Sequence, residues 1–260
     1  MSAPKPGNIT PGHDFADTTY ADMVRSALAL SAVFTRERVR RRRVGELIDD
    51  AVQATGAVVS ANTNLGIVLL FAPLVRAEAT REPGETLRAA TERTLAALDV
   101  ADATAAFAAI AAAAPGGLGE APEHDVRAPA RVSLRAAMAA AADRDSIASE
   151  YATGFAIVFE DGLPVLTEAL AAGRPTLEAV VAVHLGLLAA HPDTHIARRA
   201  GFDAARAVTA AAGQVRAGTR TLEDFDAWLR ADGHRLNPGT TADLVAATLL
   251  VALLTGVELP

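Results

Sequence analysis

The chain has 260 residues, of which 51% are hydrophobic and only 4% aromatic, and its formal net charge at pH 7 is −7. This acidity excludes a general nucleic-acid binder, which needs a basic surface to neutralise phosphates, although a local arginine cluster could still hold a small anionic substrate. The absence of cysteine excludes disulfides, thiolate catalysis and Cys-ligated zinc.

The ends of the chain show no signal for export or membrane insertion. Residues 1–12 are polar, contain three prolines and lack the apolar core of a signal peptide. Residues 242–257 form the most apolar tract, but this tract is short for a membrane span and carries Asp243 near its start. We therefore expect a cytoplasmic protein with neither a membrane nor a nucleic acid as its partner.

The first half of the chain predicts helices separated by short breaks. Alanine, the strongest helix former, is abundant, whereas aromatic strand formers are few. After a loop or tail over residues 1–19, helical patterns cover residues 20–35, 44–55, 65–80 and 85–114. The segment 65–80 is apolar nearly all round, which predicts a buried helix that Pro73 ends or kinks. Six arginines within 36–43 lie in a predicted loop, and we interpret them as a solvated linker.

The second half of the chain follows a Gly- and Pro-rich loop over residues 115–129. A long helix is predicted from about Ser133, and on one of its faces Ile147, Tyr151, Phe155 and Phe159 recur every four residues. Further helices cover residues 176–190, 194–217 and 221–231, and the last begins near Thr241. No alternating apolar and polar run predicts a strand. The fold class is therefore all-α: a single domain over residues 1–260, built as a multi-helix orthogonal bundle with buried Ala- and Leu-rich helices.

Several common cofactor sites are excluded by the sequence. A P-loop needs a lysine after its glycine loop, and the only lysine, Lys5, is followed by proline. The Gly-Gly-Leu-Gly loop at residues 116–119 lacks the dinucleotide-binding spacing and follows no strand. His191 and His195 are four residues apart, but Pro192 places His191 outside the helix, so a surface or capping role is favoured over a metal pair.

Five polar clusters stand where helices are predicted to begin. They comprise residues 5–22, residues 62–66, the glycine loop with Asp125 and the later Arg144, Asp145 and Glu150, residues 192–199, and residues 237–243. Taken singly, each cluster has a structural interpretation. Helix caps would account for Asn62, Asn64, Asp193 and Thr241, and a capping box for the spacing of Thr240 and Asp243. A solvated helix face would account for Asp145 and Glu150. Together they predict more, since helix N-termini also bind anions.

These clusters resemble the motifs of the triphosphoribosyl-dephospho-CoA synthase family. The matching blocks are Lys5-Pro6-Gly7-Asn8 with His13-Asp14 and Asp17-Thr18-Thr19-Tyr20, Asn62-Thr63-Asn64-Leu65-Gly66, the glycine loop with Asp125, Arg144-Asp145-Ser146-Ile147-Ala148 with Glu150-Tyr151, Pro192-Asp193-Thr194 with Arg198, and Asn237-Pro238-Gly239-Thr240-Thr241-Ala242-Asp243. The last block is the most specific, and the blocks follow the family order over residues 5–243.

Two features set this chain apart within the resemblance. Its Asp-Thr-Thr-Tyr block is more similar to the archaeal and methylotroph branch than to the citrate-lyase branch. Family members usually carry another helix before the Lys-Pro-Gly block, whereas only four residues precede it here. The resemblance therefore implies either that the start of the sequence is misassigned or that this member lacks the N-terminal helix of the family.

The resemblance implies an enzyme that moves the triphosphoribosyl group of ATP onto the 2′-hydroxyl of 3′-dephospho-CoA and releases adenine. Displacement at an anomeric carbon passes through an oxocarbenium-like transition state. The reaction needs a base for the acceptor hydroxyl and an acid for the departing adenine. It also needs Mg²⁺ and cationic side chains to hold the triphosphate.

The site residues follow from this implied chemistry. The candidate bases are Asp145, Glu150 and Asp243, and the candidate acid is His13. The candidate Mg²⁺ ligands are Asp14, Asp17 and Asp22. Substrate binding, with arginine favoured for bidentate phosphate contacts, is expected of Lys5, Asn8, Asn62, Asn64, Asp125, Arg144, Asp193, Arg198, Arg199, Asn237 and Thr241.

Three other interpretations stay open. One is an ADP-ribosyl-glycohydrolase-like, Mg²⁺-dependent hydrolase, which would use water as the acceptor. Another keeps the transfer chemistry but uses a different acceptor in cofactor biosynthesis. The third is an Ala-rich helical interaction protein without catalysis, which should show no thermal shift with ATP and Mg²⁺.

Overall fold

The computed structural model describes residues 2–113 and 123–260, and within these ranges the chain is all-α, as predicted. Fourteen α-helices and one π-helix are present in the described residues, and the only β pairing among them is an isolated bridge between Thr10 and His13. The chain divides into two compact units. Unit 1 comprises Met1–Tyr20 and Ile157–Pro260, and unit 2 comprises Ala21–Ala156. The prediction of a single domain stays a prediction.

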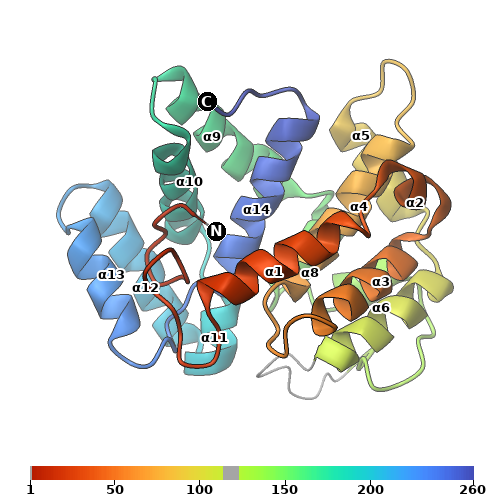
Figure 1. Ribbon diagram of the computed structural model, residues 1–260, viewed down its shortest axis with the longest axis horizontal. Coiled ribbons are helices and arrows are strands. Elements are labelled where there is room, and N and C mark those ends of the chain that lie inside the picture. The colour runs from red at the N-terminus through yellow and green to blue at the C-terminus, as the bar shows by residue number, and fades with distance from the viewer. Residues whose placement is uncertain (1, 114–122) are drawn as a thin grey trace. The chain divides into compact units, whose positions relative to one another are not determined.

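Unit 2 is a helical assembly around α3, α4 and α6. Helix α3 packs against α6 and α4, and α4 packs against α5; Figure 1 shows α3 and α6 side by side. The approach of α3 to α6 depends on Gly45, because a Cβ there would lie 2.4 Å from the backbone oxygen of Asp102. The helices are α1 (Tyr20–Ser31), α2 (Arg36–Arg41), α3 (Val44–Gly56), α4 (Leu65–Ala79), α5 (Leu87–Ala96), α6 (Val100–Ala113), α7 (Leu134–Ala139) and α8 (Ser146–Thr153).

Pro73 lies inside α4 and does not end it, contrary to one of the two predicted outcomes. Proline has no N–H, so the carbonyl four residues earlier, that of Leu69, loses its intrahelical donor. The hydroxyl of Tyr151, on α8, donates to this same carbonyl at 2.7 Å, and the contact is buried. Burial and the charge of Asp102 raise the pKa of Tyr151, so the hydroxyl keeps its proton and remains a donor. The tyrosine therefore replaces the hydrogen bond that proline removed.

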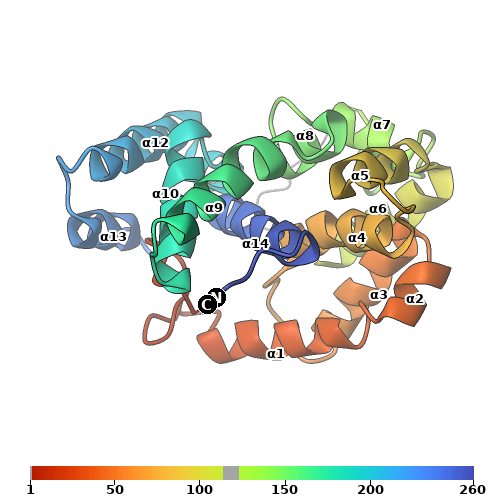
Figure 2. The ribbon, with the colours of Figure 1, turned by 90° about the horizontal axis from the view of Figure 1, so that it is seen from above.

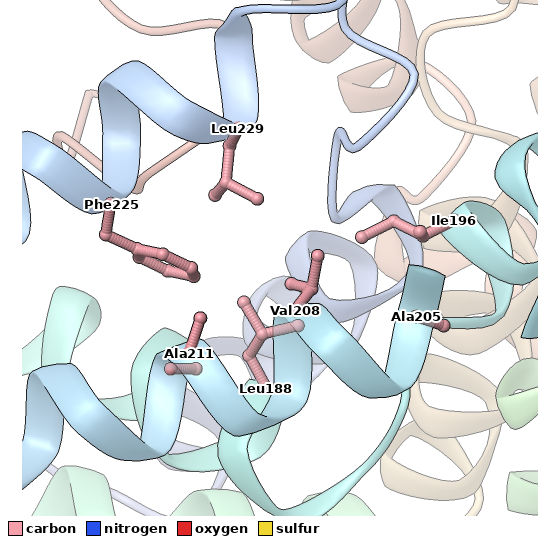
Figure 3. Close-up of a cluster of buried hydrophobic side chains, with 8 residues drawn as sticks. Leu188, Ile196, Ala205, Val208, Ala211, Phe225 and Leu229 are labelled. Carbon is pink, nitrogen blue, oxygen red and sulfur yellow. The ribbon is translucent and has the colours of Figure 1, made fainter. Parts of the chain in front are cut away.

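Unit 1 contains the π-helix and six α-helices. Helix α10 packs against α9, α12 and α14, and Figure 2 shows α12 and α13 on one side of α10. Figure 3 shows Leu188, Ile196, Val208, Phe225 and Leu229 converging from α10, α11, α12 and α13 into one buried cluster. The elements are η1 (Ile157–Gly162), α9 (Leu163–Ala171), α10 (Thr176–Ala190), α11 (Thr194–Ala200), α12 (Phe202–Arg216), α13 (Leu222–Arg230) and α14 (Gly239–Leu254).

The prediction of a single long helix is wrong for three segments, because a local cap divides each of them. The segment 85–114 forms α5 and α6, and α6 begins where the Asp99 carboxylate accepts from the N–H groups of Ala101 and Asp102. The helix from Ser133 is divided into α7 and α8, and α8 ends at left-handed Gly154, after which Phe155 has φ 62° and a π-helix follows. The segment 194–217 is broken at Gly201, whose φ is +93°.

The arginine run at 36–43 is also not the predicted loop. It forms α2, which Thr35 caps through the N–H of Arg38. Arg38 and Arg42 both pair with Asp50, at 2.8 and 3.0 Å, and Arg43 pairs with Asp99. These carboxylates hold three of the arginines in ion pairs, and the side-chain contacts raise the pKa of both Arg42 and Arg43.

No helix in the described parts of the chain is by itself long and apolar enough to cross a membrane. Within the same described residues, one pair, α5 and α6, reaches the required length and hydropathy together, and it is bent by 95° at the break between the two helices.

Candidate functional site

The Lys5–Asn8 segment of unit 1 forms a tight turn that its sequence dictates. The Asn8 N–H donates to the Lys5 carbonyl at 3.2 Å, with proline and glycine at the two central positions. A type II turn favours this pair, because proline fixes a negative φ and the next residue must have a positive one. Gly7 has φ +74°, and a Cβ on it would lie 2.9 Å from side-chain atoms of both Leu229 and Pro238. Only glycine satisfies both the backbone angle and the space.

Long-range hydrogen bonds hold this turn against α13 and the start of α14. The Asn8 amide donates to Asn237 Oδ1 at 2.7 Å and to the Pro238 carbonyl at 3.3 Å, although these residues are about 230 positions away in the chain. On the α13 side, the Gly7 N–H donates to Asp226 Oδ1 at 2.7 Å, and Arg230 donates to the Asn8 carbonyl at 2.8 Å. The first and last of the predicted blocks therefore meet.

Asp226 and Arg230 are site residues that the sequence analysis missed. They form an ion pair of 2.8 Å within α13. Burial would raise the pKa of Asp226, but the hydrogen bonds from Arg230 and the Gly7 N–H outweigh it and lower this pKa. The signal was present as an acid and a base four residues apart on a predicted helix, a spacing that places them on one face.

Asp193 joins the starts of α11 and α14. It is buried, and its Oδ1 accepts from the Ile196 N–H at 3.0 Å, which caps α11. Its Oδ2 accepts from both the N–H and the hydroxyl of Thr241 at 2.7 Å. Burial raises the pKa of this carboxyl, while the bonds from Thr241 and Ile196 oppose the shift. Its predicted capping role is confirmed, and the same side chain also supplies an acceptor to α14.

The predicted capping box of Thr240 and Asp243 is wrong. Helix α14 begins at Gly239, with Pro238 at the cap position, so Thr240 lies inside the first turn. The Thr240 hydroxyl accepts from Thr194 at 3.1 Å. Because proline offers no capping side chain, the buried Asp193 provides the acceptor that a local cap would have supplied.

The loop after the turn carries the predicted acid and two predicted metal ligands. His13 is exposed and pairs with Thr10 through their backbones. Asp14 accepts from the Tyr20 N–H at 2.7 Å, at the first residue of α1. Phe15 stacks on His234 with ring centroids 4.1 Å apart, and exposed Asp17 lies 3.9 Å from the same imidazole. The loop therefore contacts the connection between α13 and α14.

Lys5 and His184 are two buried ionisable residues at this turn. Lys5 is 6% exposed. His184, on α10, is 0% exposed, and neither ring nitrogen makes a hydrogen bond of normal geometry. Burial lowers the pKa of Lys5 to about 8. Burial, with the charge of Lys5, lowers the pKa of His184 to about 3 against the weaker effect of the Pro6 carbonyl.

Comparison with known proteins decides the family. The family model described as ATP:dephospho-CoA triphosphoribosyl transferase matches residues 1–259. The chain belongs to this family. The motif resemblance is thereby confirmed over nearly the whole sequence.

Individual relatives agree with the family assignment. Proteins from Pectobacterium atrosepticum and Pectobacterium carotovorum, both described as 2-(5′′-triphosphoribosyl)-3′-dephosphocoenzyme-A synthases, are 36% identical over 106 residues. This match covers 39% of the chain and 34% of each relative, so the chain spans about a third of the length of these curated relatives. A crystal structure from Archaeoglobus fulgidus, described as that of a triphosphoribosyl-dephospho-CoA synthase, has a TM-score of 0.70 at 25% identity. The match covers 92% of this chain and 99% of that chain.

Other candidates of this family member lie on unit 2, where most make local contacts. Asn62 accepts from the Leu65 N–H at 3.1 Å, and buried Asn64 donates to Thr55 at 3.1 Å. Asp145 caps α8 through the N–H groups of Ile147 and Ala148. Asp125 pairs with Arg127, and Arg144 donates to the Ala140 carbonyl. The last candidate, Glu150, is fully buried.

The solvated-face prediction for Asp145 and Glu150 is therefore wrong. Asp145 is the N-cap of α8 and not a residue of a long helix, and Glu150 is buried on the face of α8 that it shares with Ile147, three residues earlier. The glycine loop at 116–119, predicted to belong to the site, lies outside the described residues.

The three carboxylates predicted for Mg²⁺ do not form a metal site of protein ligands alone. Among the described residues, no three His, Asp or Glu side chains gather around one point. Asp14 caps the start of α1, and Asp22, in unit 2, pairs with Arg25 at 3.4 Å. Mg²⁺ needs fewer protein ligands when the substrate supplies phosphate oxygens. Exposed Asp17 and Asp14 in unit 1 fit this second mode.

His195 and the two arginines of α11 complete the unit 1 candidates. Arg198 and Arg199 are exposed, and Asp243 is half-buried one turn into α14. The His195 ring packs against Gly239, where a Cβ would approach it to 3.2 Å. Burial, followed by the charges of Arg198 and Arg199, lowers the pKa of His195 to about 4. His191 instead pairs with Asp161 at 2.8 Å, so the two histidines have separate roles.

Proposed function

We propose that this chain transfers the triphosphoribosyl group of ATP to the 2′-hydroxyl of 3′-dephospho-CoA and releases adenine. One observation carries the proposal. The Lys-Pro-Gly-Asn turn and the Asn-Pro-Gly-Thr-Thr start of α14, which bear the most specific family motifs, are joined by the Asn8–Asn237 hydrogen bond of 2.7 Å. Family membership over residues 1–259 supports the same activity.

The reaction breaks the bond between the ribose anomeric carbon of ATP and N9 of adenine. It forms a bond from that carbon to the acceptor oxygen, and the acceptor proton passes to a base while adenine takes up a proton. We assign the base to Asp243, on the first turns of α14, with Asp145 and Glu150 as the alternatives from unit 2. His13, exposed on the loop before α1, is our candidate for protonating adenine.

We assign the binding roles from the chemistry of each side chain. Lys5, Arg198 and Arg199 would hold phosphate oxygens, and Asn237 would hold a ribose hydroxyl or the adenine amine. The Thr241 N–H and hydroxyl both donate to Asp193. Thr241 would therefore serve the substrate as an acceptor, and Asp193 would act by holding Thr241 in place.

The other proposed contacts involve side chains of unit 2 and the metal. Asn62, Asn64, Asp125 and Arg144 remain candidates for substrate binding, and Asn8 would position Asn237. Bound with the triphosphate, Mg²⁺ would neutralise its charge, and Asp14 and Asp17 would hold it from unit 1. Asp22, which lies in unit 2, remains a candidate Mg²⁺ ligand.

The deciding experiment measures adenine release from ATP and Mg²⁺, with and without 3′-dephospho-CoA, followed by mass spectrometry. Adenine that appears only with the acceptor, together with a triphosphoribosyl adduct, would support the proposal. Acceptor-independent adenine with free triphosphoribose would favour the hydrolase. No adenine, with no ATP-dependent thermal shift, would favour a non-enzymatic protein.

Two matched variants test the proposed base. Asp243→Asn should reduce adenine transfer by at least about a hundredfold, the usual contribution of a general base, while its thermal unfolding stays near that of the parent chain. Asp203→Asn removes an exposed carboxylate of α12 in the same unit and should leave transfer unchanged. Near-normal transfer in Asp243→Asn would remove this residue from the mechanism.

A further inference from the structure

Two side chains of α13 hold the turn at residues 5–8 through its backbone. The Asp226 carboxylate accepts from the Gly7 N–H at 2.7 Å, and Arg230 donates to the Asn8 carbonyl at 2.8 Å. The two side chains also pair with each other at 2.8 Å, and both are half-buried. Each therefore makes one contact with the turn and one with its neighbour on α13, which fixes the place of the turn against the helix. Neither residue belongs to the motif blocks.

The Asn8 side chain carries this placement to Asn237. Its amide nitrogen donates to Asn237 Oδ1 at 2.7 Å and to the Pro238 carbonyl at 3.3 Å. A carbonyl can only accept, so the end of Asn8 that faces Pro238 must be the nitrogen and not the oxygen. The Asn8 Oδ1 is buried without a partner, so the donor end alone orients this side chain.

The orientation of Asn8 fixes that of Asn237 in turn. Because Asn8 presents a donor, Asn237 must turn its oxygen toward it, and its own amide nitrogen is the free end. This nitrogen bonds to no described residue and is not among the buried atoms that lack a partner, so it reaches the surface of half-buried Asn237. The backbone of Asn237 is also held, because its N–H donates to the His234 carbonyl at 3.1 Å and its carbonyl accepts from Gly239 at 2.9 Å.

We propose that Asp226 and Arg230 are positioning residues for Asn237: through Asn8 they hold its amide so that the nitrogen donates to an acceptor oxygen of ATP. The identity of the ligand rests on the proposed function. A ribose hydroxyl and the phosphate oxygens can accept this bond. The exocyclic amine of adenine cannot, because its lone pair is delocalised into the ring. Of the two groups proposed for Asn237, the hydroxyl therefore fits its free end and the amine does not.

The donor role is tested with two variants of Asn237, by isothermal titration calorimetry of the full chain with ATP and Mg²⁺ at pH 7. Asn237→Asp has nearly the same shape and keeps an oxygen for Asn8, but it replaces the free donor with a carboxylate oxygen. Asn237→Ala removes the donor without adding a charge. Each should weaken ATP binding by about tenfold, the loss expected for one hydrogen bond. Parent affinity in Asn237→Ala would overturn the inference.

The positioning role is tested in two backgrounds. Asp226→Ala should raise the Kd and the KM for ATP by about fivefold with little change in kcat, because a binding contact is lost and not one made only in the transition state. In the Asn237→Ala background the same change should have no further effect, since the residue that it positions has lost its amide. Equal effects in both backgrounds would show a general structural role and overturn the inference.

Conservative and control variants separate positioning from a loss of folding. Asp226→Asn keeps an acceptor for the Gly7 N–H and should recover part of the affinity lost in Asp226→Ala. Asp203→Ala removes an exposed acid that pairs with Arg206 on α12 of the same unit, and its ATP affinity should equal that of the parent chain. Circular dichroism on heating identifies a temperature at which all the variants are folded, and the affinities are compared there. Equal affinities of Asp226→Ala and Asp203→Ala would contradict the positioning role.

The two sources of the acceptor oxygen are distinguished with inorganic tripolyphosphate. If Asn237→Ala weakens binding of both tripolyphosphate and ATP, the acceptor is a phosphate oxygen, whereas loss for ATP alone places it on the ribose. The proposed function fails separately, when the parent chain binds ATP but releases no adenine with 3′-dephospho-CoA; the affinities then still decide the role of Asn237. Absence of ATP binding by the parent chain would overturn the inference.

Discussion

The candidate site residues of the two units are held in different ways. In unit 2, Asn62, Asp125 and Asp145 bind groups two or three residues away, as caps and short loops do. In unit 1, Asn8 binds Asn237 across 229 positions, and Asp193 binds Thr241 across 48. Local contacts survive changes elsewhere in the unit, whereas long-range contacts fail together. Among these candidates, loss of a single side chain should therefore destabilise the protein more in unit 1.

The largest expected effect is that of Asp193→Ala. This change uncaps α11 and leaves the buried N–H and hydroxyl of Thr241 without their acceptor. Losses of this kind add to about 4 kcal/mol of unfolding free energy, near the upper end for a single substitution. Urea denaturation followed by Trp228 fluorescence measures it, because the only tryptophan of the chain lies on α13 in unit 1.

Thr241→Val provides the matched control for Asp193. It removes one hydroxyl donor but keeps the backbone N–H bond and the cap of α11, so it should cost about 1 kcal/mol. Equal effects of the two variants would contradict the view that Asp193 couples the two helix starts.

Acid should destabilise unit 1 through His184. The folded pKa is about 3 and the ordinary value is 6.5, so the unfolded chain binds more protons between these values. Stability therefore falls as pH falls through that window, by about 2 kcal/mol from this group between pH 7 and pH 5. His195, with a pKa of about 4, acts in the same direction.

The contribution of His184 is isolated by comparison with His184→Gln. Urea midpoints measured by Trp228 fluorescence at pH 7 and pH 5 should differ less in the variant than in the parent chain. Identical pH dependence in the two proteins would show that His184 is not neutral and buried in the folded state.

Unit 2 also has long-range polar contacts, and the buried one between Tyr151 and Leu69 offers a test within that unit. Tyr151→Phe leaves the Leu69 carbonyl without a donor and should cost about 2 kcal/mol. Pro73→Ala returns an N–H to the same carbonyl, so the double variant should lose much less than Tyr151→Phe alone. Urea denaturation followed by far-ultraviolet circular dichroism measures the free energy of unfolding of each variant. Strictly additive effects of Tyr151→Phe and Pro73→Ala would contradict the view that both act on the Leu69 carbonyl.

Local signals explain what could be predicted from the sequence. The bounds of α10, the cap role of Asp193 and the all-α class follow from composition, periodicity and capping residues, which act over a few positions. The motif blocks also identified the Lys5 turn and the start of α14. Breaks at Asp99, Asp145 and Gly201 were missed because each residue is also tolerated within a helix, and only the backbone angle or the accepted N–H shows the cap.

Burial and pairing at a distance could not be predicted in the same way. His184 sits in an apolar helix between valine and leucine, where a core histidine gives no periodic signal. Asp226 and Arg230 hold the Lys5 turn because α13 packs against a segment more than 200 positions earlier in the chain. Similarly, the partner of the Leu69 carbonyl is not encoded near Pro73. These contacts depend on tertiary packing, and the pattern of residues along the sequence does not reveal that packing.

The smallest expected effect separates a cap from a substrate ligand. Asn62 is exposed and accepts only a local N–H at the start of α4 in the described contacts, so Asn62→Ala should cost about 1 kcal/mol or less. Buried Asn64 donates to Thr55, and Asn64→Ala should cost more than Asn62→Ala because it leaves a buried hydroxyl without its partner. Adenine transfer by Asn62→Ala, measured with saturating ATP and 3′-dephospho-CoA and again near KM, decides its second role. A tenfold rise in KM with that small stability loss would indicate that Asn62 touches substrate, whereas unchanged kinetics would leave it a helix cap and move recognition to the side chains of unit 1.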